Sequence, residues 1–188
     1  PDGERTMNTF LGASVNFTTA DLEPSLIEAA SIVYLEGYLF DRIEAKNAFK
    51  KAARLARKSG AKVALTLSDA FCVDRHRDDF RELIRQGTDI VFANEKEITS
   101  LYEVNSFAEA ADAVLADCEL AVLTRSEEGS VIVANGETIA IAPEPVRKVV
   151  DVTGAGDLYA SGFLYGLTQG LSLPTCGRVG SLAAAEVI

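Results

Sequence analysis

The chain has 188 residues, 48% hydrophobic and 24% charged, which suits one sizeable globular domain. Its 18 Lys and Arg against 28 Asp and Glu give a net charge of −10, which argues against nucleic acid or an anionic membrane surface as a partner. The sequence shows no signal peptide and no apolar run of membrane-spanning length. Cys72, Cys118 and Cys176 are scattered without metal-binding spacing, which predicts structural thiols in a reducing, cytoplasmic setting.

Short apolar runs alternate with amphipathic segments along the first two thirds of the chain. The runs predict buried strands, and the segments between them predict helices. The expected strands are 31–35, 62–67, 89–93 and 120–124, and the expected helices are 44–58, 74–86, 94–102 and 106–116. This order favours a parallel sheet covered by helices on both faces, a three-layer α/β/α fold. Residues 7–14 are a further candidate strand. The single histidine, His76, lies in a charged segment and is interpreted as part of a solvated face.

The pattern changes after residue 124. Runs 129–134 and 137–142 flank Asn135-Gly136, a strong hairpin signal. Two helices then follow, over 155–169 and from 174 to the end. No repeat or linker is visible, so residues 1–188 are interpreted as a single domain. Pro1 at the start and a helical run at the end suggest a part of a longer chain.

The stretch from Asp151 to Asp157 (DVTGAGD) carries the most chemistry. Gly154 and Gly156 flank Ala155, so the backbone can approach a ligand closely. A helix that begins there directs unpaired N–H groups and its positive dipole end at the turn, which makes an anion hole. Asp157 beside it is suited to take a proton from a hydroxyl nucleophile. Phosphoryl transfer to an alcohol needs both features. The alternative is an ordinary helix start in which Asp157 only complements the dipole.

The DxTGAGD stretch resembles the signature of the ribokinase-like, PfkB-type sugar and nucleoside kinases. Asn94-Glu95-Lys96-Glu97 resembles that family's NxxE motif, and residues 124–129 resemble its TxGxxG nucleotide loop. The order and spacing of the three motifs also match. A Walker-type GxxxxGK[ST] loop and a GxGxxG fingerprint are both missing.

The resemblance implies ATP and Mg²⁺ as cofactors and assigns roles to the matching residues. Asp157 acts as the base, and the N–H groups of Ala155, Gly156 and Asp157, in the turn that contains Gly154, form the anion hole. Asn94 lies near the triphosphate, and Glu97 holds a network of magnesium, water and phosphate. Asn94 and Glu97 also form a capping box by spacing, which is the plainer interpretation. Asp151 and Thr153 lie where the family holds a monovalent cation such as K⁺.

The nucleotide loop is the least regular match. Thr124, Arg125, Ser126 and Gly129 are its candidate cofactor-binding residues. Ser126 stands where the family has Gly, which bears on how closely the backbone can approach a nucleotide. Arg125 either contacts a phosphate or is a solvated surface charge, Thr124 either belongs to the loop or only ends a strand, and Gly129 serves either the nucleotide or the following turn.

Glu36 follows the first strand, and related kinases place contacts to sugar hydroxyls there, so it is a candidate substrate residue; the alternative is a charged loop residue. Residues 4–13 and 34–38 resemble adenosine-kinase-like bacterial members. A primary hydroxyl of an adenosine-like nucleoside is therefore the expected acceptor group, with ribose or fructose as the alternative acceptor. A non-catalytic nucleotide- or sugar-binding protein is the rival from another class.

The resemblance also covers what lies outside the chain. The family's acceptor-binding turn and lid strands normally precede this region, and a cation- and adenine-flanking segment follows it. Both portions are expected to be absent from residues 1–188. A homodimer formed through that lid is a further expectation.

Overall fold

The computed structural model describes residues 8 and 10–188. A six-stranded sheet runs through its centre in the order β1-β2-β3-β4-β5-β6. The strands are β1 Ile32–Glu36, β2 Lys62–Thr66, β3 Ile90–Asn94, β4 Leu120–Thr124, β5 Ser130–Ala134 and β6 Glu137–Ile141. The first four are parallel, and β5 and β6 join antiparallel through the predicted Asn135-Gly136 hairpin.

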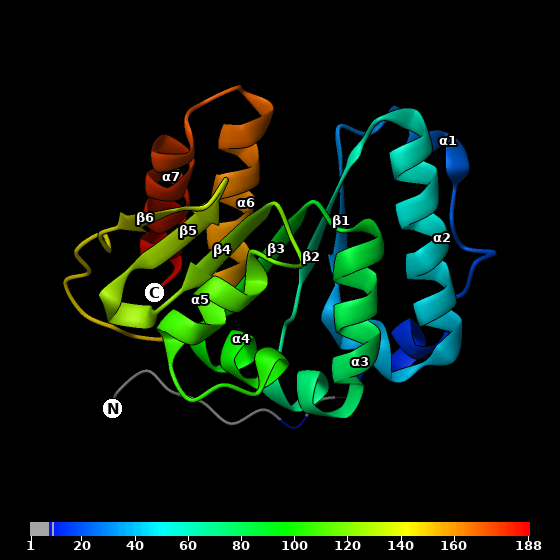
Figure 1. Cartoon of the computed structure of the whole chain (residues 1–188), viewed down its shortest axis with the longest axis horizontal. Coiled ribbons are helices and arrows are strands. Elements are labelled where there is room, and N and C mark those ends of the chain that lie inside the picture. The colour runs from blue at the N-terminus through cyan, green and yellow to red at the C-terminus, as the bar shows by residue number, and fades with distance from the viewer. Residues whose placement is uncertain (1–7, 9) are drawn as a thin grey trace.

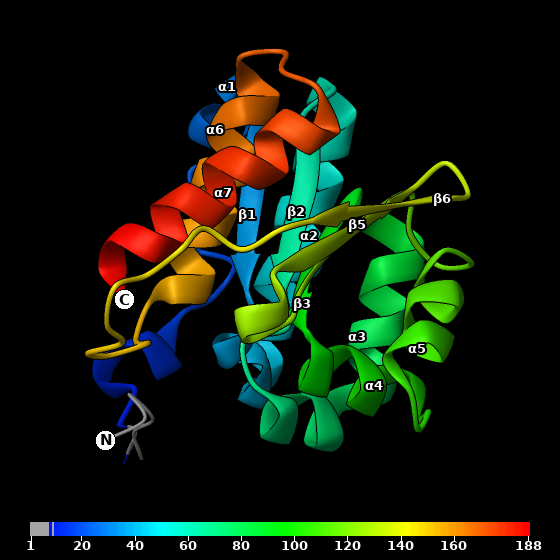
Figure 2. The same ribbon diagram turned by 90° about the vertical axis from the view of Figure 1, so that its left-hand side faces the viewer.

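The helices pack on both faces of this sheet (Figures 1 and 2). They are α1 Pro24–Ala29, α2 Ile43–Ser59, α3 Ala70–Gly87, α4 Glu95–Tyr102, α5 Phe107–Val114, α6 Ala155–Thr168 and α7 Leu173–Val187. Right-handed crossovers between parallel strands laid down in sequence order place the connecting helices on one face. Accordingly, α2 to α5 share one apolar core with the sheet, whereas α6 and α7 share a second core on the other face. The three-layer α/β/α architecture is confirmed.

Most element boundaries agree with the sequence pattern to within two residues. Helix α3 is the exception, because it begins four residues before the expected start at 74. Asp69 caps it by accepting from the Phe71 N–H at 3.2 Å, and the helix is kinked at His76, where φ is −131° and ψ 25°. The kink changes the direction of the helix axis, so the residues before it do not continue the apolar period of the residues after it.

The strand predicted over 7–14 is wrong in the described part of that segment. Leu11 has helical backbone angles and Gly12 has φ +58°, so the chain turns into a 3₁₀ helix, η1 Gly12–Asn16. Met7 and residues 4–6 and 9 of the adenosine-kinase-like stretch lie outside the described residues. Helix α1 was not predicted, because its six residues are too few to show a period.

His76 is not on a solvated face. Its side chain is 17% exposed, with Nε2 2.7 Å from Asp41 and Nδ1 3.1 Å from the Lys46 ammonium. The three cysteines are free and buried, as expected of structural thiols. Within residues 8 and 10–188, no helix combines the length and the apolar character needed to cross a bilayer.

Candidate active site

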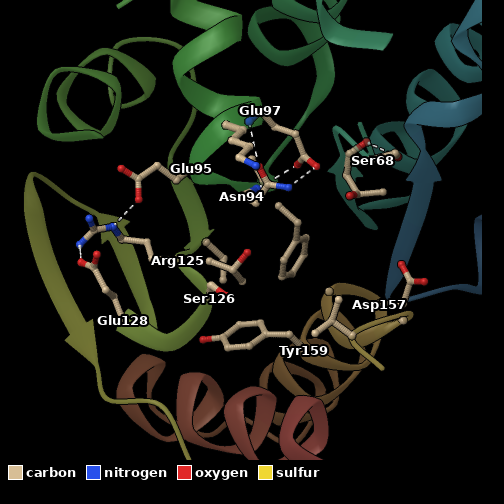
Figure 3. A pocket seen from close by; sticks show the side chains of 18 of the residues that line it. Ser68, Asn94, Glu95, Glu97, Arg125, Ser126, Glu128, Asp157 and Tyr159 are labelled. Atoms are coloured by element: carbon tan, nitrogen blue, oxygen red, sulfur yellow. Dashed lines mark hydrogen bonds and ion pairs between the residues drawn. The ribbon is translucent and has the colours of Figure 1, made fainter. Parts of the chain in front are cut away.

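A pocket of about 640 Å³ opens at the carboxyl ends of the parallel strands. The register places these ends side by side, with Glu36 opposite Thr66 and Asn94 opposite Thr124. In open α/β sheets this edge is where ligands bind. The start of α6 closes the pocket from the other face, so the sheet edge, the α4 start and the DxTGAGD turn all meet there (Figure 3).

The turn before α6 presents backbone N–H groups to the pocket. Gly154 is the N-cap, and Gly156 and Asp157 of the first helical turn line the pocket with it. The Ala155 N–H donates to the Val152 carbonyl at 3.2 Å, so it is already used within the turn. Helix geometry leaves Gly156 and Asp157 without intrahelical acceptors. These two N–H groups are therefore the available part of the anion hole predicted from the sequence.

The two glycines of the turn differ in why they are glycines. Gly154 has φ +81°, a torsion that other residues resist, whereas Gly156 is helical. A Cβ at Gly156 would meet no protein atom within 4 Å. The unusual torsion of the turn therefore belongs to Gly154 and not to Gly156. The open space beside Gly156 faces the pocket instead.

Asn94 and Glu97 form the capping box that starts α4. The Glu97 carboxylate accepts from the Asn94 N–H at 2.9 Å and from its side-chain amide at 2.6 Å, and Asn94 Oδ1 accepts from the Glu97 N–H at 2.9 Å. Glu97 is only 6% exposed and still lines the pocket. The capping interpretation and the pocket-lining position are thus both true of the same residues.

Burial raises the pKa of Glu97 from its usual value of 4.5 to about 7, against the Asn94 N–H, which lowers it. The charges of Asp69 and Glu36 raise the pKa further. Burial also raises the pKa of Glu36, and the charge of Asp157 adds to that shift. The charges of these carboxylates therefore influence one another across the pocket.

The nucleotide loop runs from Thr124 to Gly129. Thr124, Arg125 and Ser126 line the pocket, whereas Gly129 lies behind it. Gly129 has φ +84°, and a Cβ there would lie 2.2 Å from the Ile141 carbonyl oxygen. Packing of the loop against β6 therefore accounts for this glycine. Ser126, in the place of the expected glycine, adopts φ +52°.

Arg125 ties this loop to the helices beside it. Its guanidinium contacts Glu95 at 2.9 Å and Glu128 at 2.7 Å, and it lies 4.3 Å from the centre of the Phe107 ring. Figure 3 shows both ion pairs on the side of the pocket away from Asp157. Arg125 is therefore a paired charge. It could contact a phosphate only by breaking its contacts with Glu95, Glu128 or Phe107.

The remaining predicted residues divide into two groups. Glu36 lines the pocket, on the far side of Asn94 and Glu97 from Arg125. Asp151 and Thr153 do not: they lie in the exposed segment before α6, where Asp151 accepts from the Thr153 N–H at 2.8 Å. A cation site at Asp151 and Thr153 stays a prediction.

Several lining residues were missed from the sequence. They are Tyr38, Thr66, Ser68, Phe92, Ala93, Glu95, Lys96, Val122, Glu127, Glu128, Val152 and Tyr159. Most of these residues belong to no recognisable sequence motif, so only the fold shows that they line the pocket. For Ser68 there was a signal, because polar residues that directly follow a buried parallel strand fall at the ligand-binding edge.

Magnesium is the metal that the family resemblance implies. Mg²⁺ keeps several waters and is usually bound through one or two carboxylates and substrate phosphates. Glu97, raised in pKa and facing the pocket, is the residue that would hold it through water. Among the described residues, no group of three acidic, His or Cys side chains has the geometry to hold a metal alone.

Comparisons with known proteins identify the family. The model of the pfkB family of carbohydrate kinases matches residues 1–188. The chain therefore belongs to that family. A probable sugar kinase from Rhizobium etli CFN 42 has a TM-score of 0.97 at 50% identity over all of this chain. An adenosine kinase from Sinorhizobium meliloti has the same TM-score at 49% identity. Adenosine kinase from Saccharomyces cerevisiae is 29% identical over 96% of the chain.

The chain spans 57% of each of those solved chains and 56% of the yeast protein. It therefore corresponds to a little over half of its relatives.

Proposed function

We propose that the protein transfers the γ-phosphoryl group of ATP to a hydroxyl of a small polyhydroxylated acceptor. The observation that carries the proposal is the meeting of the Gly156 and Asp157 N–H groups, the Asp157 carboxylate and Glu97 around one pocket at the sheet edge. Positioning and electrostatic stabilisation supply most of the catalysis of phosphoryl transfer, and this pocket offers groups for both.

Each group has a part in this scheme. Asp157 accepts the proton of the attacking hydroxyl, and the N–H groups of the turn stabilise charge on the transferring phosphoryl group. Bound Mg²⁺ would neutralise phosphate charge, and Glu97 and Asn94 would hold its water shell. Thr124 to Ser126 border the nucleotide. Six acidic and two basic side chains line the pocket, and Lys96 is the basic one not tied in an ion pair among the described residues.

For the acceptor, we propose an adenosine-like nucleoside, with a sugar of the ribose or fructose type as the second candidate. The Sinorhizobium meliloti and yeast relatives are named adenosine kinases, which favours the nucleoside. The Rhizobium etli relative is named a probable sugar kinase, which supports the sugar as the second candidate.

The test is a coupled ATP-consumption screen of the full-length protein against nucleosides and sugars, with D157N beside it. The amide keeps the shape of Asp157 but cannot take the proton. We expect kcat to fall by roughly 10²- to 10⁴-fold while ATP binding and Tm hold. D112N, an exposed change on α5, serves as the matched control. Near wild-type turnover by D157N would refute the assignment.

A further inference from the structure

Ser68 sits in a strained turn at the carboxyl end of β2. The Asp69 N–H donates to the Leu67 carbonyl at 2.8 Å, which closes a three-residue turn around Ser68. Ser68 has φ +68°. A γ-turn with a positive central φ is the rare, strained form.

Four non-glycine residues of the described chain have positive φ: Ser68, Glu103, Ser126 and Asn135. Glu103 ends α4 as its C-cap, and Asn135 opens the hairpin turn, where this torsion is ordinary. Only Ser68 and Ser126 line the pocket. Strained torsions of this kind gather at functional sites, where the surrounding structure holds them.

The strain brings the Ser68 hydroxyl to Glu36. The hydroxyl donates to Glu36 Oε1, and Figure 3 shows the bond at the pocket wall above Asp157. The backbone is equally close: a Cβ at Gly37 would lie 2.7 Å from the Thr66 carbonyl oxygen and 2.8 Å from Ser68 Oγ. The end of β1 is thus pressed against the turn, and Glu36 has a fixed partner there.

We propose that Ser68 is a positioning residue that fixes the Glu36 carboxylate toward the acceptor, so that Glu36 selects acceptors by a second hydroxyl. Ser68 holds one carboxylate oxygen, and the Tyr38 and Gly37 N–H groups also reach the carboxylate. Its remaining lone pairs can accept from a hydroxyl that is not phosphorylated. The acceptor class is then a ring with at least two hydroxyls, such as a ribose, and the deoxy analogue is disfavoured. This inference rests on the proposed kinase function.

The charge of Glu36 supports this arrangement. Burial raises the pKa of Glu36, whereas the bond from Ser68 lowers it, as do the N–H groups of Tyr38 and Gly37. Ser68 therefore helps to keep Glu36 ionised, which is the form that accepts hydrogen bonds best.

The experiment compares S68A, S68G, S68T and E36Q in the full-length protein, with adenosine against 2′- and 3′-deoxyadenosine, or with the sugar from the screen against its deoxy forms. S68A and S68G both lose the hydroxyl, but only S68G also relieves the torsion. We expect both to raise the acceptor KM and to reduce discrimination against one deoxy analogue by about tenfold, while the KM for ATP holds.

S68T keeps the hydroxyl on a residue that resists positive φ. We expect it to retain acceptor discrimination and to lower Tm, whereas S68G leaves Tm equal or higher. N135G, which relieves a similar torsion outside the pocket, should change no kinetic constant. If acceptor discrimination depends on the hydroxyl and Tm depends on the torsion, Ser68 positions Glu36. A merely structural role would change Tm alone.

Three outcomes overturn different statements. If E36Q loses discrimination while S68A and S68G keep it, Ser68 does not position Glu36. If S68A, S68G and E36Q all leave discrimination unchanged although D157N is inactive, the kinase proposal stands and the Ser68 inference fails. An active D157N removes the proposed function itself.

Discussion

Gly154 and Gly156 have separate structural duties in the turn before α6. Gly154 supplies a left-handed torsion at the N-cap, and Gly156 leaves open space in the first helical turn. Asp157 follows directly, so the position of its carboxylate depends on the first glycine. In the proposed function, the approach of a phosphate depends on the second glycine.

Substitution should separate these duties. G154A should lower the free energy of unfolding by about 1 kcal/mol, because alanine resists the torsion. G156A should leave stability equal or slightly higher, since alanine is the better helix former. Urea unfolding checks both expectations.

The kinetics of position 156 test the anion hole. A bulky side chain in G156V should obstruct the transferring phosphoryl group and lower kcat by roughly 10²-fold or more, the scale of losing one oxyanion donor. The Kd for ATP should change far less, because charge concentrates on that group in the transition state. Equal losses in both constants would mean that the turn only shapes the pocket.

At the scale of elements, helix α4 begins at a charged group that is costly to bury. A folded-state pKa of about 7 for Glu97, above its usual 4.5, means that the folded chain keeps a proton that the unfolded chain releases. The stability of the neutral form is therefore present below pH 4.5 and lost as pH rises through about 7.

E97Q should remove this pH dependence. Without nucleotide or metal, the Tm of the wild type should fall more between pH 5 and pH 8 than the Tm of E97Q. In unfolding free energy, the two proteins should differ in this pH effect by up to about 3 kcal/mol. E109Q, the same change in the exposed capping box of α5, is the matched control. Kinetically, E97Q should raise the Mg²⁺ requirement. A stability loss equal at both pH values, with kinetics intact, would leave Glu97 only as a cap.

Arg125 fastens the nucleotide loop to α4 and α5. R125A removes its ion pairs with Glu95 and Glu128 and its stacking on Phe107. We expect the KM for ATP to rise about tenfold, because the loop is no longer held, while the acceptor KM changes little. R178A, with a highly exposed arginine, is the control. An unchanged KM for ATP would show that the loop holds its shape without Arg125.

The sequence predicted elements wherever the pattern was local. Apolar runs located all six strands, and Asn94 and Ser106 marked the starts of α4 and α5. The start of α3 was not predicted although Asp69 caps it, because the kink at His76 interrupts the apolar period. The turn at Gly12 was not predicted because it follows no period. The DxTGAGD turn and Glu36 could be identified by chemistry at known strand and helix ends. Tyr38, Phe92 and Tyr159 line the pocket only because distant segments meet there.

For the whole molecule, stability should be highest in the middle of the sheet. Strands β2, β3 and β4 are buried on both faces, whereas β6 is mostly exposed. Amide hydrogen exchange should therefore be slowest at Val63, Val91 and Val122 and fastest in α1 and β6. Faster exchange in β3 than in β6 would contradict this ranking.

The order of the strands has a consequence for synthesis. Because neighbours in the sheet are also neighbours in the sequence, each new strand of this chain leaves the ribosome after the strand it pairs with. All six strands of the described sheet, including the hairpin, lie before residue 142. Helix α6, which brings Asp157, docks onto a surface that is already formed. The Asp157 carboxylate is thus placed only after the six described strands have been synthesised.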